Sequence, residues 1–234
     1  MAFQKTAGET ASTQNMIHQC YFLQAQATQL FTHEPYVPFG LEPEVNPTIL
    51  DACPELRSKE VRLAVLEHAA FLWHWRNHRD TDPWIGFTSY RQVEKQFPFI
   101  FESRAHVERE LTRADIVSWG LVKFAVTLSQ QAELFHPGIN EYMGRLFGAF
   151  GETIPREYHL FHGGGFANYW VMSWENFDAY MHWFAPKLTW CLANGEQPYA
   201  RDNPKWLSYV LERLFIVWYL TTRKNIVFVG GVAA

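Results

Sequence analysis

The sequence predicts an α/β protein in which helices pack against a single sheet. Short runs rich in β-branched and aromatic residues alternate with longer stretches that carry apolar residues at helical spacing, and this alternation is typical of α/β sheets. The 234 residues are enough for one domain with a sizeable core. Hydrophobic residues make up 48% of the chain and charged residues 19%, as in folded globular proteins rather than disordered chains.

The first strands are expected close to the amino terminus. Residues 1–15 are polar and predict a disordered tail, so the folded domain is expected over residues 16–229. Residues 17–24, IHQCYFLQ, have the composition of a first strand. Residues 35–40, PYVPFG, predict a second, short strand because proline and glycine bound them.

A long helix and a buried strand are expected next. Ser58 is suited to cap a helix, and residues 59–77 carry apolar side chains at helical spacing. This stretch predicts a helix of about five turns. Pro83 cannot lie inside a helix, and residues 84–90, WIGFTSY, therefore predict a buried strand reached after a tight turn.

The second half of the chain continues the alternation of strands and helices. Its glycine-rich segment lets the backbone turn tightly or approach a ligand closely. The expected elements are a strand at 114–119, helical residues 128–150 broken at Pro137-Gly138, a glycine-rich approach into a strand at 162–173, helices at 174–193 and 205–222, and a final strand at 225–229.

The composition disfavours several classes of protein. A net charge of −4 offers no overall basic face to nucleic acid. The three cysteines lie far apart with no C-x-x-C, which disfavours a disulfide framework or a zinc site and fits a reducing cytoplasm. No apolar run has the length of a signal peptide or of a membrane span. We therefore expect a soluble cytoplasmic protein that does not bind nucleic acid.

The abundance of aromatic residues and the glycines around residue 164 suggest a sugar-binding region. Aromatic residues make up 17% of the chain, including 10 Trp, and flat rings can cover the apolar faces of sugars as well as fill a core. Trp170 can stack on a sugar or occupy a core position in its strand. Asn168 can bind a sugar hydroxyl or serve as a turn amide. His162 can contact a ligand or be an ordinary surface histidine.

Polar residues flank the expected strand 84–90 at both ends. Ligands of open α/β sheets bind outside the carboxyl ends of the strands. Asp80 and Asp82 precede the strand, so we interpret them as a solvated turn and not as metal ligands. Tyr90 and Arg91 lie at the carboxyl end, where a hydroxyl and a rigid guanidinium suit phosphate oxygens. The alternative for Arg91 is a structural salt bridge.

Three further charged or titratable residues are candidates. Glu212 and Arg213 interrupt an otherwise apolar helix, where unpaired burial is costly. Glu212 can therefore face the cleft as a base while Arg213 meets phosphate, or the two can form a buried ion pair. His136, before Pro137-Gly138, can contact phosphate or a metal, or be a satisfied surface or core group.

Four blocks of the chain, spread in order over residues 17–222, resemble a family of small, mostly bacterial glycosyltransferases of capsular and surface polysaccharide synthesis. The family has a Trp-x-Trp-Lys-Asn helix, a strand ending Gly-Leu-x-His-Tyr-Arg-Arg, an Asn-Met-Phe-Ile segment and a Ser-Glu-Arg-Leu-Phe helix. Ser89 and Gln92 stand where it has the His and the second Arg. The matching residues are Glu67, Trp73, Trp75 and Asn77; Gly86, Tyr90 and Arg91; Asn168, Phe177, Tyr180, Trp183 and Pro186; and Glu212, Arg213, Leu214, Phe215 and Trp218.

The resemblance implies a single-domain GT-A-like (Rossmann-like) fold with a mixed sheet flanked by helices. It also implies transfer of a hexosyl or deoxyhexosyl unit from a nucleotide-diphosphate sugar to a carbohydrate acceptor. On this basis Glu212 and Arg91 are the expected catalytic residues, and Glu67 is either structural or a second cleft carboxylate. Stabilising the leaving diphosphate requires a divalent metal, Mn²⁺ or Mg²⁺, or Arg and Lys donors. The alternatives are a non-catalytic carbohydrate-binding protein and a nucleotide-sugar hydrolase.

Overall fold

The computed structural model describes residues 16–77, 83–92, 99–165, 168–194 and 203–230. Six strands form the main sheet, and two more, β5 (Leu121–Lys123) and β6 (Gly163–Gly165), form a separate two-stranded antiparallel sheet, which we call the β5–β6 sheet. The order across the main sheet is β2 (Tyr36–Gly40), β1 (Ile17–Tyr21), β3 (Trp84–Ser89), β7 (Trp170–Ser173), β4 (Ile116–Ser118) and β8 (Ile226–Phe228).

One edge of this mixed sheet collects the ends of most strands. β7 runs antiparallel to its neighbours β3 and β4, whereas the other pairs are parallel. The carboxyl ends of five strands and the amino end of β7 therefore meet at one edge, which we call the carboxyl edge. The register agrees, because Trp170 at the start of β7 lies opposite both Phe87 and Ser118.

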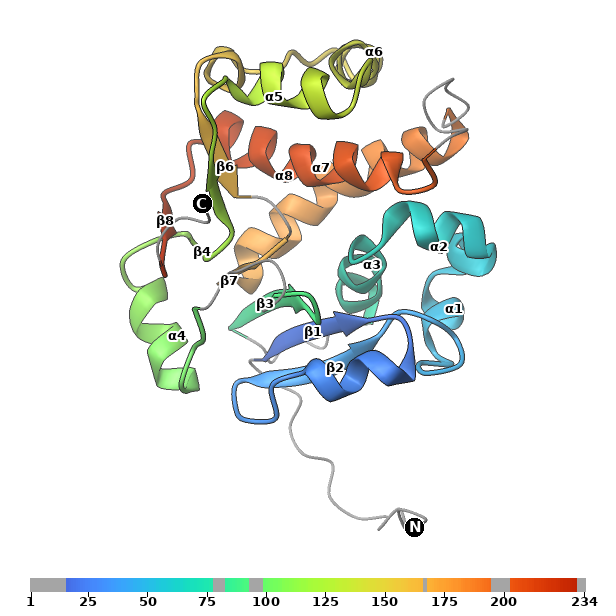
Figure 1. Ribbon diagram of the computed structural model, residues 1–234, viewed down its shortest axis with the longest axis vertical. Helices are drawn as coiled ribbons and strands as arrows, with labels where there is room; N and C mark the ends of the chain where they lie inside the picture. The colour runs from blue at the N-terminus through green and yellow to red at the C-terminus, as the bar shows by residue number, and fades with distance from the viewer. Residues whose placement is uncertain (1–15, 78–82, 93–98, 166–167, 195–202, 231–234) are drawn as a thin grey trace.

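Helices cover both faces of the sheet, with the larger number on one face (Figure 1). α4 packs on one face, where Val107 joins a small core with Trp84, Val117 and Val171. α3, α7 and α8 pack on the other face. The helices are α1 (Ile49–Ala52), α2 (Lys59–Val65), α3 (His68–Asn77), α4 (Arg104–Leu111), α5 (Leu128–Phe135), α6 (Ile139–Ala149), α7 (Trp174–Ala193) and α8 (Trp206–Thr222), with 3₁₀ turns η1 (Gln24–Gln29), η2 (Pro54–Arg57) and η3 (Arg156–His159).

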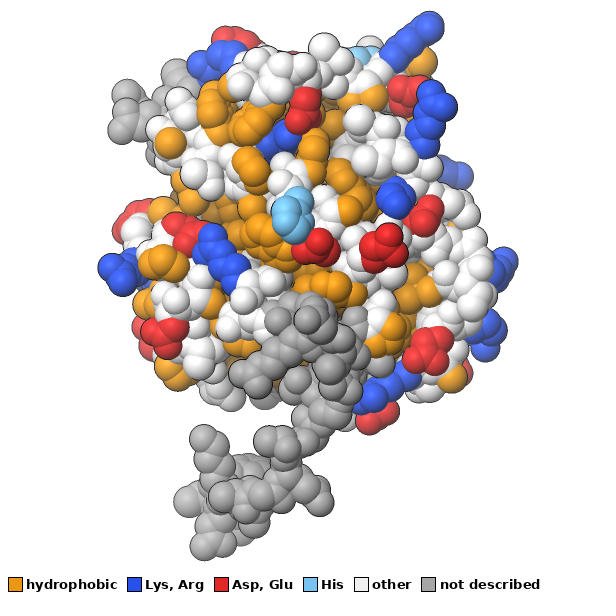
Figure 2. Space-filling model, turned by 180° about the vertical axis from the view of Figure 1, so that it is seen from behind, with side chains coloured by type: hydrophobic (Ala, Val, Ile, Leu, Met, Phe, Trp, Pro, Cys, Tyr) orange, Lys and Arg blue, Asp and Glu red, His pale blue; other side chains and the backbone are white. Residues whose placement is uncertain are grey.

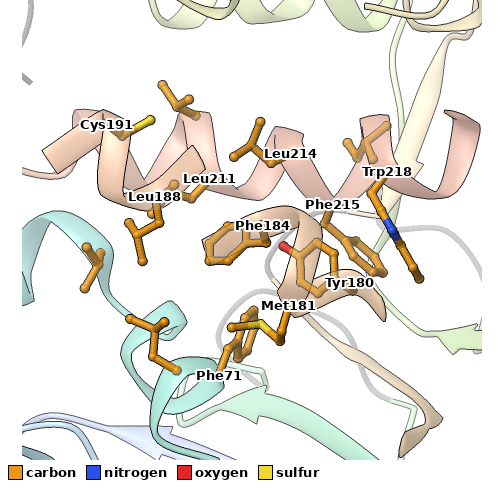
Figure 3. Close-up of a cluster of buried hydrophobic side chains, with 14 of the residues drawn as sticks. Phe71, Tyr180, Met181, Phe184, Leu188, Cys191, Leu211, Leu214, Phe215 and Trp218 are labelled. Atoms are coloured by element: carbon orange, nitrogen blue, oxygen red, sulfur yellow. The ribbon is translucent and has the colours of Figure 1, made fainter. Parts of the chain in front are cut away.

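The main core lies between the sheet and α3, α7 and α8. Figure 3 shows apolar side chains of α7 and α8 pointing toward one another, with Phe71 of α3 reaching the same cluster. Trp170 on the sheet stacks on Phe215 of α8, with ring centroids 5.4 Å apart. Much of the aromatic content of the chain is therefore used to join the long helices to the sheet.

The surface seen from behind carries few clusters of like charge. In Figure 2 hydrophobic side chains gather across the middle of this face, and Lys and Arg side chains lie mostly along its rim. Such scattered cations are what a chain with a net charge of −4 leads one to expect.

The predicted α/β class, a mixed sheet flanked by helices, is confirmed, and several boundaries need correction. The first strand ends at Tyr21 because residues 24–29 form a 3₁₀ turn. The predicted glycine-rich strand at 162–173 is divided, since β6 pairs with β5 and only β7 enters the main sheet. The predicted break at Pro137-Gly138 is confirmed, with Gly138 at φ 85°.

The predicted long helix 59–77 is two helices. Ser58 caps α2 by accepting a hydrogen bond from the Val61 backbone at 3.2 Å, as the sequence predicts. α2 then ends at Leu66, whose backbone adopts φ 50° and ψ −129°. A non-glycine residue in such a conformation stores about 1–3 kcal/mol and persists only where the surroundings enforce it. The break changes the direction of the chain immediately before Glu67.

Candidate active site

The carboxyl edge gathers the polar residues that follow β3 and precede β7. Tyr90 and Arg91 leave β3 in a turn in which the Tyr90 backbone donates to the Cys20 carbonyl at 3.0 Å. Asn168 lies just before β7, which is the strand beside β3. The structure thus brings Tyr90, Arg91 and Asn168 to one edge of the sheet.

A buried pair of hydroxyls joins these two segments. The Ser89 Oγ and the Tyr169 hydroxyl are 2.8 Å apart, and both residues are buried. Ser89 Oγ also accepts a hydrogen bond from the Arg91 backbone at 3.3 Å. Because Ser89 contacts both segments, it ties the turn that carries Arg91 to the approach into β7.

Three charged side chains act electrostatically on the Tyr169 hydroxyl. Burial raises the pKa of Tyr169, the hydrogen bond with Ser89 lowers it, and the carboxylates of Glu67 and Glu212 raise it further. Arg91 lowers the same pKa. Glu67, Glu212 and Arg91 therefore all lie within electrostatic range of one buried hydroxyl, although they come from three different parts of the chain.

Glu67 is the site residue whose importance the sequence understated. Its side chain is half-buried, and burial followed by the Glu67 charge raises the pKa of the Cys20 thiol at the end of β1. No described residue donates a hydrogen bond to its carboxylate or forms an ion pair with it. A half-buried carboxylate without such a donor, directly after the strained Leu66, has the features of a functional group. The resemblance had marked Glu67 as either structural or a second cleft carboxylate, but the positive φ of Leu66 cannot be read from a helical pattern.

Asn168 has unusual surroundings as well. Its side chain is only 3% exposed, and its backbone is left-handed at φ 57°, a conformation that Asn tolerates better than most residues. Within the described part of the chain its Nδ2 has no hydrogen-bond partner. A buried amide donor in this state costs free energy unless a ligand or water satisfies it.

Arg213 and His136 belong to a second group, which we call the α5–α8 contact. Arg213 is 2% exposed and donates to the Tyr209 carbonyl at 2.9 Å and to Gln131 Oε1 at 2.6 Å. His136 stacks on Tyr209 with centroids 3.8 Å apart, and burial followed by the charge of Arg213 lowers its pKa to about 4. These two predicted phosphate contacts are thus engaged with α5 and α8, on the side of α8 away from the sheet (Figure 1).

The remaining predicted residues have separate positions. Trp170 is 1% exposed and enclosed by aromatic rings, so it takes the core position that was the alternative to sugar stacking. His162 is exposed and lines a cavity of about 380 Å³ beside the β5–β6 sheet. Asp80 and Asp82 lie outside the described residues, and their predicted exclusion as metal ligands stays a prediction.

The described residues provide neither a cluster of metal ligands nor a membrane-spanning helix. Among the described residues, no group of three or more His, Cys, Asp or Glu side chains is arranged to hold a metal ion. None of the helices over the described ranges is both long and apolar enough to cross a bilayer.

Comparison with known proteins shows the fold. The apo structure of the WbbM bifunctional glycosyltransferase superposes on this chain with a TM-score of 0.59 at 12% sequence identity. The match covers 94% of this chain and 45% of that one, so the chain spans less than half the length of its structural neighbour. No protein-family model and no curated protein matches the sequence. The sheet and its helices therefore form an architecture that a glycosyltransferase also has, which agrees with the predicted GT-A-like class.

Proposed function

We propose that this protein is a glycosyltransferase that moves a hexosyl or deoxyhexosyl unit from a nucleotide-diphosphate sugar to a hydroxyl of a carbohydrate acceptor in surface glycan synthesis. The observation that carries the proposal is the placement of Tyr90, Arg91 and the buried Asn168 amide at the carboxyl edge, where the Ser89–Tyr169 hydroxyl pair joins their two segments. Ligands of open α/β sheets bind at this edge. The likeness in fold to a known glycosyltransferase supports the same class.

Arg91 and Tyr90 contact the donor diphosphate in this proposal. The bond between the anomeric carbon and the phosphate oxygen breaks, and the diphosphate leaves with the electron pair and gains negative charge. A guanidinium fixed near the leaving oxygens stabilises that charge more in the transition state than in the ground state. The link from Ser89 to the Arg91 backbone holds the turn in place.

In this proposal a carboxylate near the carboxyl edge takes the proton from the attacking hydroxyl of the acceptor sugar. As the acceptor oxygen bonds to the anomeric carbon, its proton passes to Glu212, the proposed general base. Glu67 is placed to accept a hydrogen bond from the acceptor, and Asn168 Nδ2 offers a donor to a sugar hydroxyl. Tyr169, kept neutral by its raised pKa, acts as a positioning residue through Ser89.

A carboxylate at this edge also suits a divalent metal. Mg²⁺ commonly binds through one or two carboxylates together with substrate phosphates and waters. Glu67 with the donor diphosphate and waters would hold such a metal, which leaves Glu212 as the base, and Mn²⁺ accepts the same oxygen ligands. The metal would supply charge neutralisation for the leaving diphosphate.

A thermal-shift screen of nucleotide sugars, with and without Mn²⁺, tests the proposal. A donor present at 100 times its dissociation constant stabilises the folded protein by about 2.7 kcal/mol, which raises the Tm measurably. A carbohydrate-binding protein would ignore the nucleotide. A hydrolase would release free sugar at the same rate without an acceptor, so product analysis with and without acceptor separates it from a transferase. The absence of any response to UDP-, GDP- or dTDP-sugars would refute the proposal.

A further inference from the structure

Two cavities lie next to the β5–β6 sheet. One, of about 360 Å³, is lined by the carboxyl end of α8, by β8 and by Gly163 of β6. The other, of about 380 Å³, is lined by β5 and by the segment that leads into β6. Phe161 and Gly163 line both cavities, so together they form one groove, which we call the β5–β6 groove.

The charged side chains that line the β5–β6 groove are all positive. Arg223 and Lys224 line the first cavity, and Lys123 lines the second beside His162. None of the described residues that line either cavity is acidic, and no described carboxylate forms an ion pair with these three cations. In a chain with a net charge of −4, such a set of cations is a local exception. It favours an anionic ligand.

Aromatic side chains line the same groove. Phe161 is 46% exposed although it is a large hydrophobic residue, and Phe228 is half-buried. An exposed ring beside cations suits a ligand that has both an apolar face and a negative charge. A sugar ring that carries a carboxylate or a phosphate has both properties.

The backbone at Arg223 is left-handed. Arg223 ends α8 in the left-handed conformation, at φ 54° and ψ 35°. Glycine makes this turn without strain, and an L side chain here costs about 1 kcal/mol. The chain nevertheless has an arginine at this position, and its side chain lines the groove.

The groove also adjoins the carboxyl edge. Gly165 at the end of β6 approaches Phe228 so closely that a Cβ added there would lie 3.1 Å from the Phe228 ring and 3.3 Å from the Ser118 Oγ. β6 and β8 lie next to each other at this side of the molecule (Figure 1). Phe228, at the carboxyl end of β8, lines the groove, whereas Arg223 and Lys224 precede β8 and lie toward its amino end. The groove therefore runs along β8 from the carboxyl edge toward these cations.

We propose that the β5–β6 groove binds an anionic sugar of the acceptor glycan. Arg223, Lys224 and Lys123 hold its carboxylate or phosphate groups, and Phe161 covers a sugar face. This inference rests on the proposed function only in calling the ligand an acceptor. The groove selects an acidic glycan over a neutral one, because removing the ligand charge leaves three cations without a partner.

Direct binding to the full chain tests this. The probe is a short oligogalacturonate, and the matched ligand is the same oligosaccharide with its carboxyl groups methyl-esterified. We expect the acid to bind at least about tenfold more tightly than the ester. Glucose 6-phosphate and inorganic phosphate form the second pair, which separates a phosphorylated sugar from a bare anion. A Kd for inorganic phosphate as low as those for oligogalacturonate and glucose 6-phosphate would overturn the proposal.

Two variants and one control locate the site. Arg223→Gln with Lys224→Gln should weaken oligogalacturonate binding by at least about tenfold. Phe161→Ala should weaken the oligosaccharide and leave inorganic phosphate unaffected. The control, Arg57→Gln with Lys59→Gln, removes the same charge from two exposed positions near α2 and should change the Kd by less than about twofold. An equal loss in the control, or none in the groove variants, would refute the assignment.

The outcomes also separate this inference from the proposed function. Nucleotide-sugar binding that persists in the groove variants, with loss of acidic-glycan binding, supports both. If the protein binds the acidic glycan but no nucleotide sugar raises its Tm, the groove assignment holds and the proposed transferase activity is refuted. Transfer to neutral acceptors with no preference for acidic ones overturns the groove assignment alone.

Discussion

The carboxyl edge and the α5–α8 contact treat charges that are removed from solvent in opposite ways. At the α5–α8 contact, Arg213 donates to Tyr209 and Gln131, and its charge is satisfied inside the fold. At the carboxyl edge, Glu67 has no hydrogen-bond donor among the described residues. Glu212 and Arg213 are adjacent in sequence, yet Glu212 influences Tyr169 at the edge whereas Arg213 faces Gln131 of α5. A step of about 100° around a helix separates the two directions.

This difference distinguishes charges that hold the fold from charges that are available to a substrate. A satisfied buried guanidinium contributes to stability and is expensive to remove. A half-buried carboxylate with no donor contributes little to stability and keeps its capacity for a ligand. Substitutions in the two regions should therefore affect different quantities.

The largest effect is expected at the proposed base. Glu212→Gln should lower kcat by about 10²–10⁴, because the amide keeps the shape but cannot accept a proton. A Tm near that of the wild type would show that the loss is one of chemistry and not of folding. Glu67→Gln is the matched variant and should lower transfer by less. If Glu67→Gln costs more than Glu212→Gln in single-turnover rates, the role of base passes to Glu67.

A slightly smaller effect is expected from Arg91→Ala. Losing one group that stabilises developing charge should lower kcat by about 10²–10³. Because the side chain is exposed, unfolding in urea should be almost unchanged. Arg57→Ala, another exposed arginine, is the control. A variant that unfolds would identify Arg91 as part of a structural salt bridge.

Arg213→Met should show the reverse pattern. We expect the free energy of unfolding to fall by about 1–3 kcal/mol, since Gln131 Oε1 loses its donor. The kcat of the protein that remains folded should not change. Arg213→Lys keeps the charge but loses the planar guanidinium, so its free energy of unfolding should lie between those of the wild type and Arg213→Met. A selective loss of donor binding in folded Arg213→Met would place this residue in the site after all.

The smallest effect is expected from pH at the α5–α8 contact. The pKa of His136 is about 4 in the folded protein and about 6.5 when unfolded. Between these values the unfolded state binds more protons, so this contribution to stability is complete above pH 6.5 and is lost as the pH falls toward 4. Partial exposure limits the loss to about 1 kcal/mol. His136→Phe keeps the stacking on Tyr209 and should flatten the pH dependence of Tm over this window.

Much of the fold followed from local patterns. Proline and glycine marked the breaks before β3 and at Gly138, and Ser58 marked the start of α2, because these residues constrain or complete the backbone locally. The same logic predicted that Tyr90 and Arg91 follow a buried strand. β5 and α4 escaped prediction because short elements have weak periodicity.

The composition and periodicity of the chain by themselves determined an α/β protein and the position of Tyr90 and Arg91 after a strand. Only the tertiary structure decided which charges share a space. The antiparallel insertion of β7 beside β3 placed Tyr169 against Ser89. The strained backbone at Leu66 ends α2 and sets the direction of the chain at Glu67. It also assigned Trp170 to the core and Arg213 to α5. Such outcomes depend on strand order and side-chain direction between segments up to a hundred residues apart, and a sequence pattern reports only neighbours within a few turns.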